Sequence, residues 1–202
     1  MRRSSVVLAA LGGVLAIVVS ACGSSDDGDG SGSTTLGDLG SLTITTPTVT
    51  SPATLNPADY PGEPTRFDGA TGSVAVTLAN RPNVVPRIQV STPFTVTTTE
   101  VHVLKAGTGP VVPSTATVEV HYLGVNGRDG QPFDSSYQGG EPASFPLDGV
   151  IPGFTKGIAG QKVGSSVLVA VAPADGYTQG EPSAGIEPGD TLIFEITILD
   201  AG

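Results

Sequence analysis

The chain of 202 residues has no tryptophan, a single cysteine and few basic side chains. The lone Cys22 cannot form a disulfide within the chain. Nine Lys and Arg residues stand against nineteen Asp and Glu residues, which gives a formal net charge of −10. An acidic protein is repelled by phosphate backbones, so we expect no nucleic acid among its partners. The simplest role of the acidity is to keep the protein soluble.

The region after residue 80 also lacks the groups that carry most covalent and metal chemistry. It has no thiol, its histidines are His102 and His121, and no carboxylates have metal-ligand spacing. We therefore expect neither a metal nor a cofactor. Both histidines are expected on solvent-exposed faces of strands. Ser135 and Ser136 are better explained by a turn than as nucleophiles, because no base is placed beside them.

The apolar run near the N-terminus, Val6 to Val19, is too short for a comfortable membrane span. Two arginines precede it and small residues follow it, which is the order of a secretory signal. It ends in Val-Ser-Ala-Cys22, which resembles the lipobox of bacterial lipoproteins. We predict a signal peptide over residues 1–22, lipidation of Cys22, and an extracytoplasmic protein held at the cell membrane by that anchor. The alternative is an ordinary signal with an accidental thiol.

Residues 23–80 are rich in Gly, Ser, Thr, Asp and Pro, and their apolar residues are scattered. Such a segment cannot bury enough apolar surface to offset its ordering entropy, so a disordered linker is predicted. Within it, Ser73 to Leu78 alternates like a strand, but no turn signal pairs this run with a neighbour. The run is therefore left unassigned.

Residues 81–202 are long enough for one compact domain, and their patterns are mainly those of strands. Apolar and polar residues alternate in Glu100 to Leu104, Val118 to Tyr122 and Leu192 to Ile198. Val167 to Ala172 is apolar throughout, which predicts a strand buried on both faces. Phe154 and Ile158 are four residues apart, the spacing of one helical face, so a short helix is expected there.

Five short motifs follow one another in this region: Val-Glu-Val-His-Tyr-Leu-Gly from residue 118, Pro-Phe-Asp-Ser-Ser from 132, Val-Ile-Pro-Gly-Phe from 150, Gly-Tyr at 176 and Gly-Asp-Thr-Leu-Ile-Phe-Glu-Ile from 189. Their order and spacing resemble the FKBP-type peptidyl-prolyl cis-trans isomerases over roughly the last hundred residues. The resemblance implies an α+β fold, in which a twisted antiparallel β half-barrel wraps around one short α-helix. It also implies an isomerase domain over residues 81–202 with no cofactor.

The resemblance further implies an apolar pocket for a proline ring. Phe154 is its floor, where the family usually has Trp, and the walls include Tyr122, Phe133 and Phe194. Asp134, held by Tyr122, polarises the twisted amide. The resemblance also implies a backbone N–H donor at Ile151 and a phenol donor at Tyr177. It assigns three more residues to the pocket: Phe145, Val150 and Ile186. Taken singly, each aromatic residue is explained more simply as a core residue. Asp134, taken alone, is explained more simply as the start of a turn.

Two loops depart from the family pattern. Tyr137 to Glu141 lacks the usual basic residue, which puts a salt bridge to Asp134 in doubt, and Gly185 stands where the family commonly has an isoleucine. The expected function is isomerisation of X-Pro bonds in exported proteins, with proline-containing polypeptides as substrates. The alternative is a catalytically weak binding or chaperone module for such segments. Macrolide inhibitors are implied as ligands, and the sequence leaves open whether they fit above Phe154.

Overall fold

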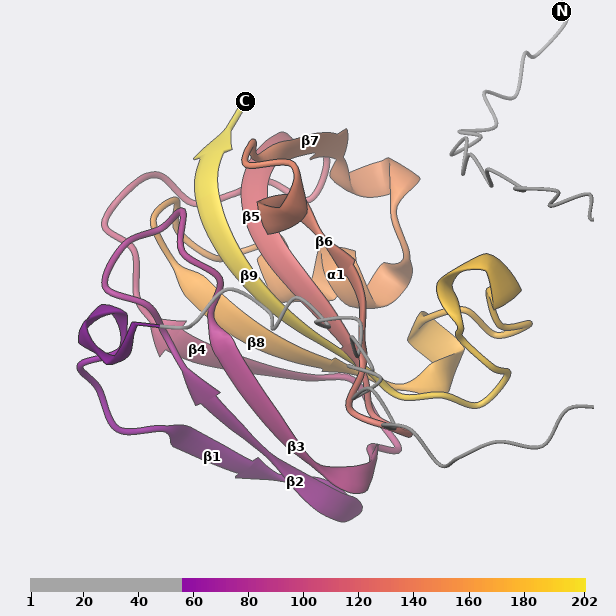
Figure 1. The fold of residues 1–202 in the computed structure, drawn as a ribbon. Coiled ribbons are helices and arrows are strands. Elements are labelled where there is room, and N and C mark those ends of the chain that lie inside the picture. Colours follow the sequence, from indigo (N-terminus) through magenta and orange to yellow (C-terminus); the bar gives the residue numbers. More distant parts are fainter. Residues whose placement is uncertain (1–55) are drawn as a thin grey trace, which may run out of the picture. The chain divides into compact units, whose positions relative to one another are not determined.

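Two antiparallel sheets and one short helix form residues 56–202, the part of the chain that the computed structural model describes (Figure 1). The predicted signal, the lipidation site Cys22 and most of the predicted linker lie outside these residues. The strands are β1 Thr65–Asp68, β2 Thr71–Thr77, β3 Arg87–Thr95, β4 Glu100–Lys105, β5 Thr117–Asn126, β6 Pro132–Ser135, β7 Ala143–Pro146, β8 Ser166–Val171 and β9 Leu192–Ala201. The helix is α1 Pro152–Ile158, and single 3₁₀ turns are η1 Pro57–Asp59, η2 Ser136–Gln138, η3 Leu147–Gly149, η4 Pro173–Asp175 and η5 Pro182–Ala184.

The larger sheet has the order β4-β8-β9-β5-β6, and β7 pairs with the first half of β5. All its pairings are antiparallel. Its inner face carries the alternating apolar residues that the sequence predicted, including Val118, Val120, Ile196 and Ile198, each at most 1% exposed. Every residue of β8 is buried, as its uninterrupted apolar run predicted. The predicted α+β half-barrel around one short helix is confirmed.

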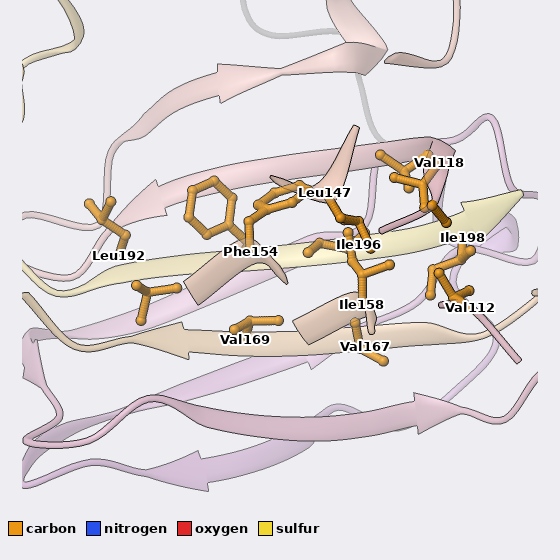
Figure 2. Packing of buried hydrophobic residues seen from close by; sticks show 14 of the residues in the cluster. Val112, Val118, Leu147, Phe154, Ile158, Val167, Val169, Leu192, Ile196 and Ile198 are labelled. Atoms are coloured by element: carbon orange, nitrogen blue, oxygen red, sulfur yellow. The ribbon is translucent and has the colours of Figure 1, made fainter. Parts of the chain in front are cut away.

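Helix α1 packs against the inner face of this sheet and supplies Phe154 and Ile158 to the core (Figure 2). Pro152 occupies its first turn, where a missing N–H is harmless. Glycines weaken a helix in isolation, but here they allow close approach to β8. A Cβ at Gly153 or Gly157 would lie 2.3 Å from a methyl group of Val171 or Val169. Packing therefore decides where this helix forms, more than propensity does.

The three strands β1, β2 and β3 form a second sheet that lies on the outer face of the larger one (Figure 1). Val74, Val76 and Phe94 are at most 2% exposed and form one apolar cluster with residues of β5, β8 and β9. The predictions of a disordered linker as far as residue 80 and of a domain that begins at residue 81 are therefore wrong for residues 57–80. The alternating run forms β2, which pairs with β1 across the short turn at Gly69 and Ala70 and with β3 across a longer connection.

Because this second sheet covers the outer face, side chains that were expected in solvent are buried. His121 is only 5% exposed and stacks on the Tyr137 ring, with 4.8 Å between ring centroids. Glu195 is completely buried. The alternation in β5 and β9 correctly separates two faces, but both faces are covered. The prediction of a solvent-exposed His121 is wrong for this reason. Among residues 56–202, no helix is long and apolar enough to cross a membrane.

Candidate active site

A cavity of about 360 Å³ opens on the inner side of the half-barrel, between β5, β6, β7, α1 and the loops that precede and follow them. Nine residues line it: Tyr122, Asp134, Phe145, Gly149, Val150, Ile151, Phe154, Tyr177 and Phe194. Most of this lining is apolar, and its polar groups are few. Such a composition suits a small apolar ring attached to a polar backbone.

Phe154 forms the base of the cavity and is 5% exposed. Three aromatic rings meet it edge to face, with centroid distances of 5.7 Å for Tyr122, 5.2 Å for Phe145 and 5.2 Å for Phe194. Edge-to-face contacts of this kind fix ring orientation as well as bury area. The four rings come from β5, β7, α1 and β9, so the cavity exists only when the sheet and the helix are assembled.

The polar edge of the cavity is built from Asp134 and two tyrosines. The Tyr122 hydroxyl donates to Asp134 Oδ2 at 2.7 Å, and the Ser135 N–H donates to Oδ1 at 2.8 Å. Burial, and then the hydrogen bond to Asp134, raise the pKa of Tyr122 well above its usual value. Burial, with the nearby Asp134 and Glu181, also raises the pKa of Tyr177. Both phenols therefore keep their protons at neutral pH and act as hydrogen-bond donors.

The backbone around Ile151 presents one more donor to the cavity. Ile151 precedes α1 in an extended conformation, and its carbonyl accepts from the Phe154 N–H at 3.0 Å. No hydrogen bond within residues 56–202 engages the Ile151 N–H. The position is compatible with the predicted role of this group as a donor to a substrate carbonyl.

Eight of the ten residues predicted for the pocket line the one cavity. The other two, Phe133 and Ile186, do not. Phe133 packs edge to face on Phe194, with ring centroids 5.5 Å apart, and so supports the wall from outside. Ile186 is 2% exposed within the core. Gly149 lines the cavity but was not predicted, because its contribution is backbone and leaves no side-chain signal.

No ion pair within residues 56–202 involves Asp134. This agrees with the missing basic residue in the loop after β6, the departure that placed a salt bridge in doubt. Lys156 on α1 pairs instead with Asp175, at 2.6 Å. Asp134 is therefore oriented by hydrogen-bond donors and not by a neighbouring cation.

Hydrogen bonds from Arg128, which the sequence did not predict, hold the loop after Tyr177. The Arg128 guanidinium donates to Asp190 Oδ1 at 3.1 Å and to the Gly185 carbonyl at 3.0 Å. Burial alone would raise the pKa of Asp190, but hydrogen bonds from Asn126, the Glu187 N–H and Arg128 outweigh it and lower that pKa. The contacts join a turn after β5 to a loop about sixty residues later, so no local pattern could reveal them.

The structure is a half-barrel closed by one helix, with an aromatic cavity and an oriented carboxyl at its edge. The profile of the FKBP-type peptidyl-prolyl cis-trans isomerases matches residues 109–199. A probable FK506-binding protein of Corynebacterium glutamicum is 42% identical over 84 residues, which cover 42% of this chain and 70% of that protein. The chain therefore belongs to the FKBP-type peptidyl-prolyl cis-trans isomerase family.

Longer relatives also match about half of this chain. A probable isomerase of this type from Haemophilus influenzae is 43% identical over 95 residues, 47% of this chain and 39% of the relative. The isomerase FkpA of Escherichia coli is 43% identical over 99 residues, 48% of this chain and 36% of the relative. The chain thus spans less than half the length of these two relatives. The crystal structure of FkpA aligns with a TM-score of 0.47 at 40% identity, covering 51% of this chain and 47% of that one.

Proposed function

We propose that the chain is a peptidyl-prolyl cis-trans isomerase acting on X-Pro bonds of exported polypeptides. The observation that carries this proposal is the aromatic cavity with Asp134 and Tyr177 at its edge. No bond breaks in this reaction: the amide twists and loses its C–N double-bond character, against a barrier of about 18–20 kcal/mol. A protein that binds the twisted amide better than either planar form lowers that barrier.

The cavity offers two means of doing so. Its apolar walls remove water from the amide, and the twisted form has less charge separation than the planar one, so it loses less on desolvation. The Asp134 carboxyl lies at the edge of the cavity and is oriented by Tyr122 and the Ser135 N–H, where it interacts with the partial charge of the twisted amide. The proline ring packs on Phe154, while Tyr177 and the Ile151 N–H hold the flanking carbonyls. A macrolide inhibitor would compete for the same space.

The experiment is the cis-to-trans rate of a short Leu-Pro-Phe peptide with the full chain added. Acceleration proportional to protein concentration is the expected result. A Val150→Glu variant places a charge in the cavity and is expected to remove most of it, whereas Val111→Glu changes a valine that is 58% exposed and does not line the cavity. If the folded parent gives no acceleration, the isomerase proposal fails. Retained binding of Pro-containing segments would then favour the chaperone module, which the altered loops motivate.

We also propose that the protein works outside the cytoplasm, anchored to the cell membrane through lipid on Cys22. The support is the order of basic, apolar and small residues that ends at this one cysteine. In a bacterial host that expresses the full chain, the parent is expected in the membrane fraction, carrying the mass of a diacylglyceryl group. A Cys22→Ser chain is expected to leave that fraction. Equal membrane retention of both chains would show that the anchor is elsewhere.

A further inference from the structure

The short turn η4, which precedes Tyr177, is tied to two other parts of the fold by one carboxylate. Asp175 ends this turn, and its Oδ2 accepts from the Lys156 ammonium at 2.6 Å and from the Thr99 hydroxyl at 2.5 Å. The Thr99 hydroxyl in turn accepts from the Ala172 N–H at 3.1 Å. A single side chain therefore joins η4 to helix α1 and to the segment just before β4.

The same carboxylate connects two parts of the aromatic cavity. Lys156 lies two residues after Phe154, the base of the cavity, and Asp175 lies two residues before Tyr177, the phenol at its edge. The ion pair thus links the backbone that carries the base to the backbone that carries the phenol. Neither member of the pair lines the cavity, so neither is placed to contact the proline ring.

Tyr177 depends on support from its neighbours in the chain. It is 38% exposed, and its hydroxyl has no hydrogen-bond partner among residues 56–202. The one residue between it and Asp175 is Gly176, and glycine restricts the backbone less than any other residue. The position of the phenol therefore depends on where η4 is held, because no hydrogen bond of its own fixes it.

Asp175 is charged at neutral pH and has donors from two elements. Hydrogen bonds from Lys156 and then from Thr99 lower the pKa of its carboxyl below the usual value. The Lys156 side chain is 55% exposed, and an exposed ion pair alone contributes little. The Thr99 hydroxyl binds the same oxygen from another direction, and hydrogen bonds to a charged acceptor are stronger than neutral ones. Together the two donors fix the carboxylate more firmly than the ion pair does.

We propose that Asp175 is a positioning residue for the isomerisation. Through Lys156 and Thr99 it holds η4, so that the Tyr177 phenol faces the substrate carbonyl beside the base at Phe154. It does not touch the reacting amide and acts only through Tyr177. The inference rests on the proposed function for the identity of the substrate, a Pro-containing peptide. Its consequence is that loss of Asp175 and loss of the Tyr177 hydroxyl are not independent.

A double-mutant cycle between Asp175→Ala and Tyr177→Phe tests this coupling. Exchange NMR of one Leu-Pro-Phe peptide with the full chain gives the isomerisation rate, and titration of the same peptide gives Kd. Each single variant is expected to weaken peptide binding and kcat/KM by about three- to tenfold, the range of one hydrogen bond. A displaced phenol has no hydroxyl contact left to lose. The double variant is therefore expected to stay within about twofold of the weaker single variant.

Two further variants complete the test. Asp175→Asn keeps an oxygen for the Thr99 hydroxyl but loses the charge that attracts Lys156, so its loss is expected to be smaller than that of Asp175→Ala. Asp59→Ala is the matched control, because Asp59 also pairs at 2.6 Å, with Arg81, and its side chain is 18% exposed against 21% for Asp175. Asp59 does not line the cavity, so rate and affinity are expected to stay within about twofold of the parent.

Circular dichroism shows whether each variant is folded, and Asp175→Asn takes the place of Asp175→Ala in the cycle if the latter is not. The positioning role is overturned if the folded variant at Asp175 matches the parent, or if the two single losses multiply in the double variant. A parent chain that binds the peptide without accelerating it contradicts the isomerase proposal alone, because the cycle in Kd still decides the role of Asp175. A parent chain that does neither overturns both.

Discussion

Replacement of Asp134 by alanine is expected to lower kcat/KM for a Leu-Pro peptide by about ten- to a hundredfold, or ~1.4–2.7 kcal/mol of transition-state stabilisation. Asp134 is the one carboxyl group among the residues that line the aromatic cavity. Its two oxygens accept from the Tyr122 hydroxyl and the Ser135 N–H, so its orientation is set before substrate arrives. A group placed in advance needs no reorganisation as the amide twists.

The measurement is a protease-coupled isomerisation assay, with circular dichroism to show that each variant is folded. Asp148→Ala is the matched control, because it removes the same charge from an exposed residue of η3 that does not line the cavity. The control is expected to stay within about twofold of the parent. Tyr122→Phe should lose less than Asp134→Ala, since the Ser135 N–H still orients the carboxyl. Full activity in a folded Asp134→Ala chain would exclude this residue from the reaction.

Replacement of Phe94 by alanine is expected to lower the free energy of unfolding of the whole domain by about 3–5 kcal/mol. Phe94 belongs to β3 but is 2% exposed, within the cluster shared with Leu123, Leu168 and Ile193 of the larger sheet. Its N–H also donates to the Gly127 carbonyl at 2.8 Å. Removal of the ring leaves a cavity between the two sheets that rigid strands cannot close.

Urea unfolding followed by circular dichroism measures this effect. Phe67→Ala is the matched control, because Phe67 is half-buried at β1, where its ring stacks on His102 at 4.1 Å between centroids. Its loss should be clearly smaller. A Phe94→Ala loss below about 1 kcal/mol would mean that the second sheet unfolds separately, and the stable domain would then begin after β3, close to the start of β4 at Glu100.

The strands of the larger sheet were predictable because a half-buried or fully buried strand leaves a local pattern. Val118, Val120 and Tyr122 alternate with Glu119 and His121, and the run from Val167 to Ala172 is apolar without a break. The aromatic cavity was predictable to a large extent for another reason. Its residues fall in short motifs with a family order, so the resemblance assigns Asp134, Ile151 and Tyr177 to one pocket, and all three line the cavity.

The second sheet left a weaker signal. The alternation around Val74 is short, the turn at Gly69 joins it to a strand of only four residues, β1, and its other partner β3 starts ten residues after β2 ends. Because residues 23–80 are rich in Gly, Thr and Pro, their composition predicted a linker. The burial of His121 and Glu195 results from this sheet, so it was not predictable either. A period of two separates the two faces of a strand but does not say what covers each face.

Local residue patterns predicted the strands of the larger sheet and the short helix, because periodicity is a local property of a chain. The half-barrel and most of the lining of the aromatic cavity were implied by the resemblance of five short motifs to a known family. The tertiary structure alone shows how β1, β2 and β3 dock, how Arg128 donates to Asp190 and how fully Glu195 is buried. Each of these depends on side chains from segments far apart in sequence, and their contacts exist only after the sheets have packed.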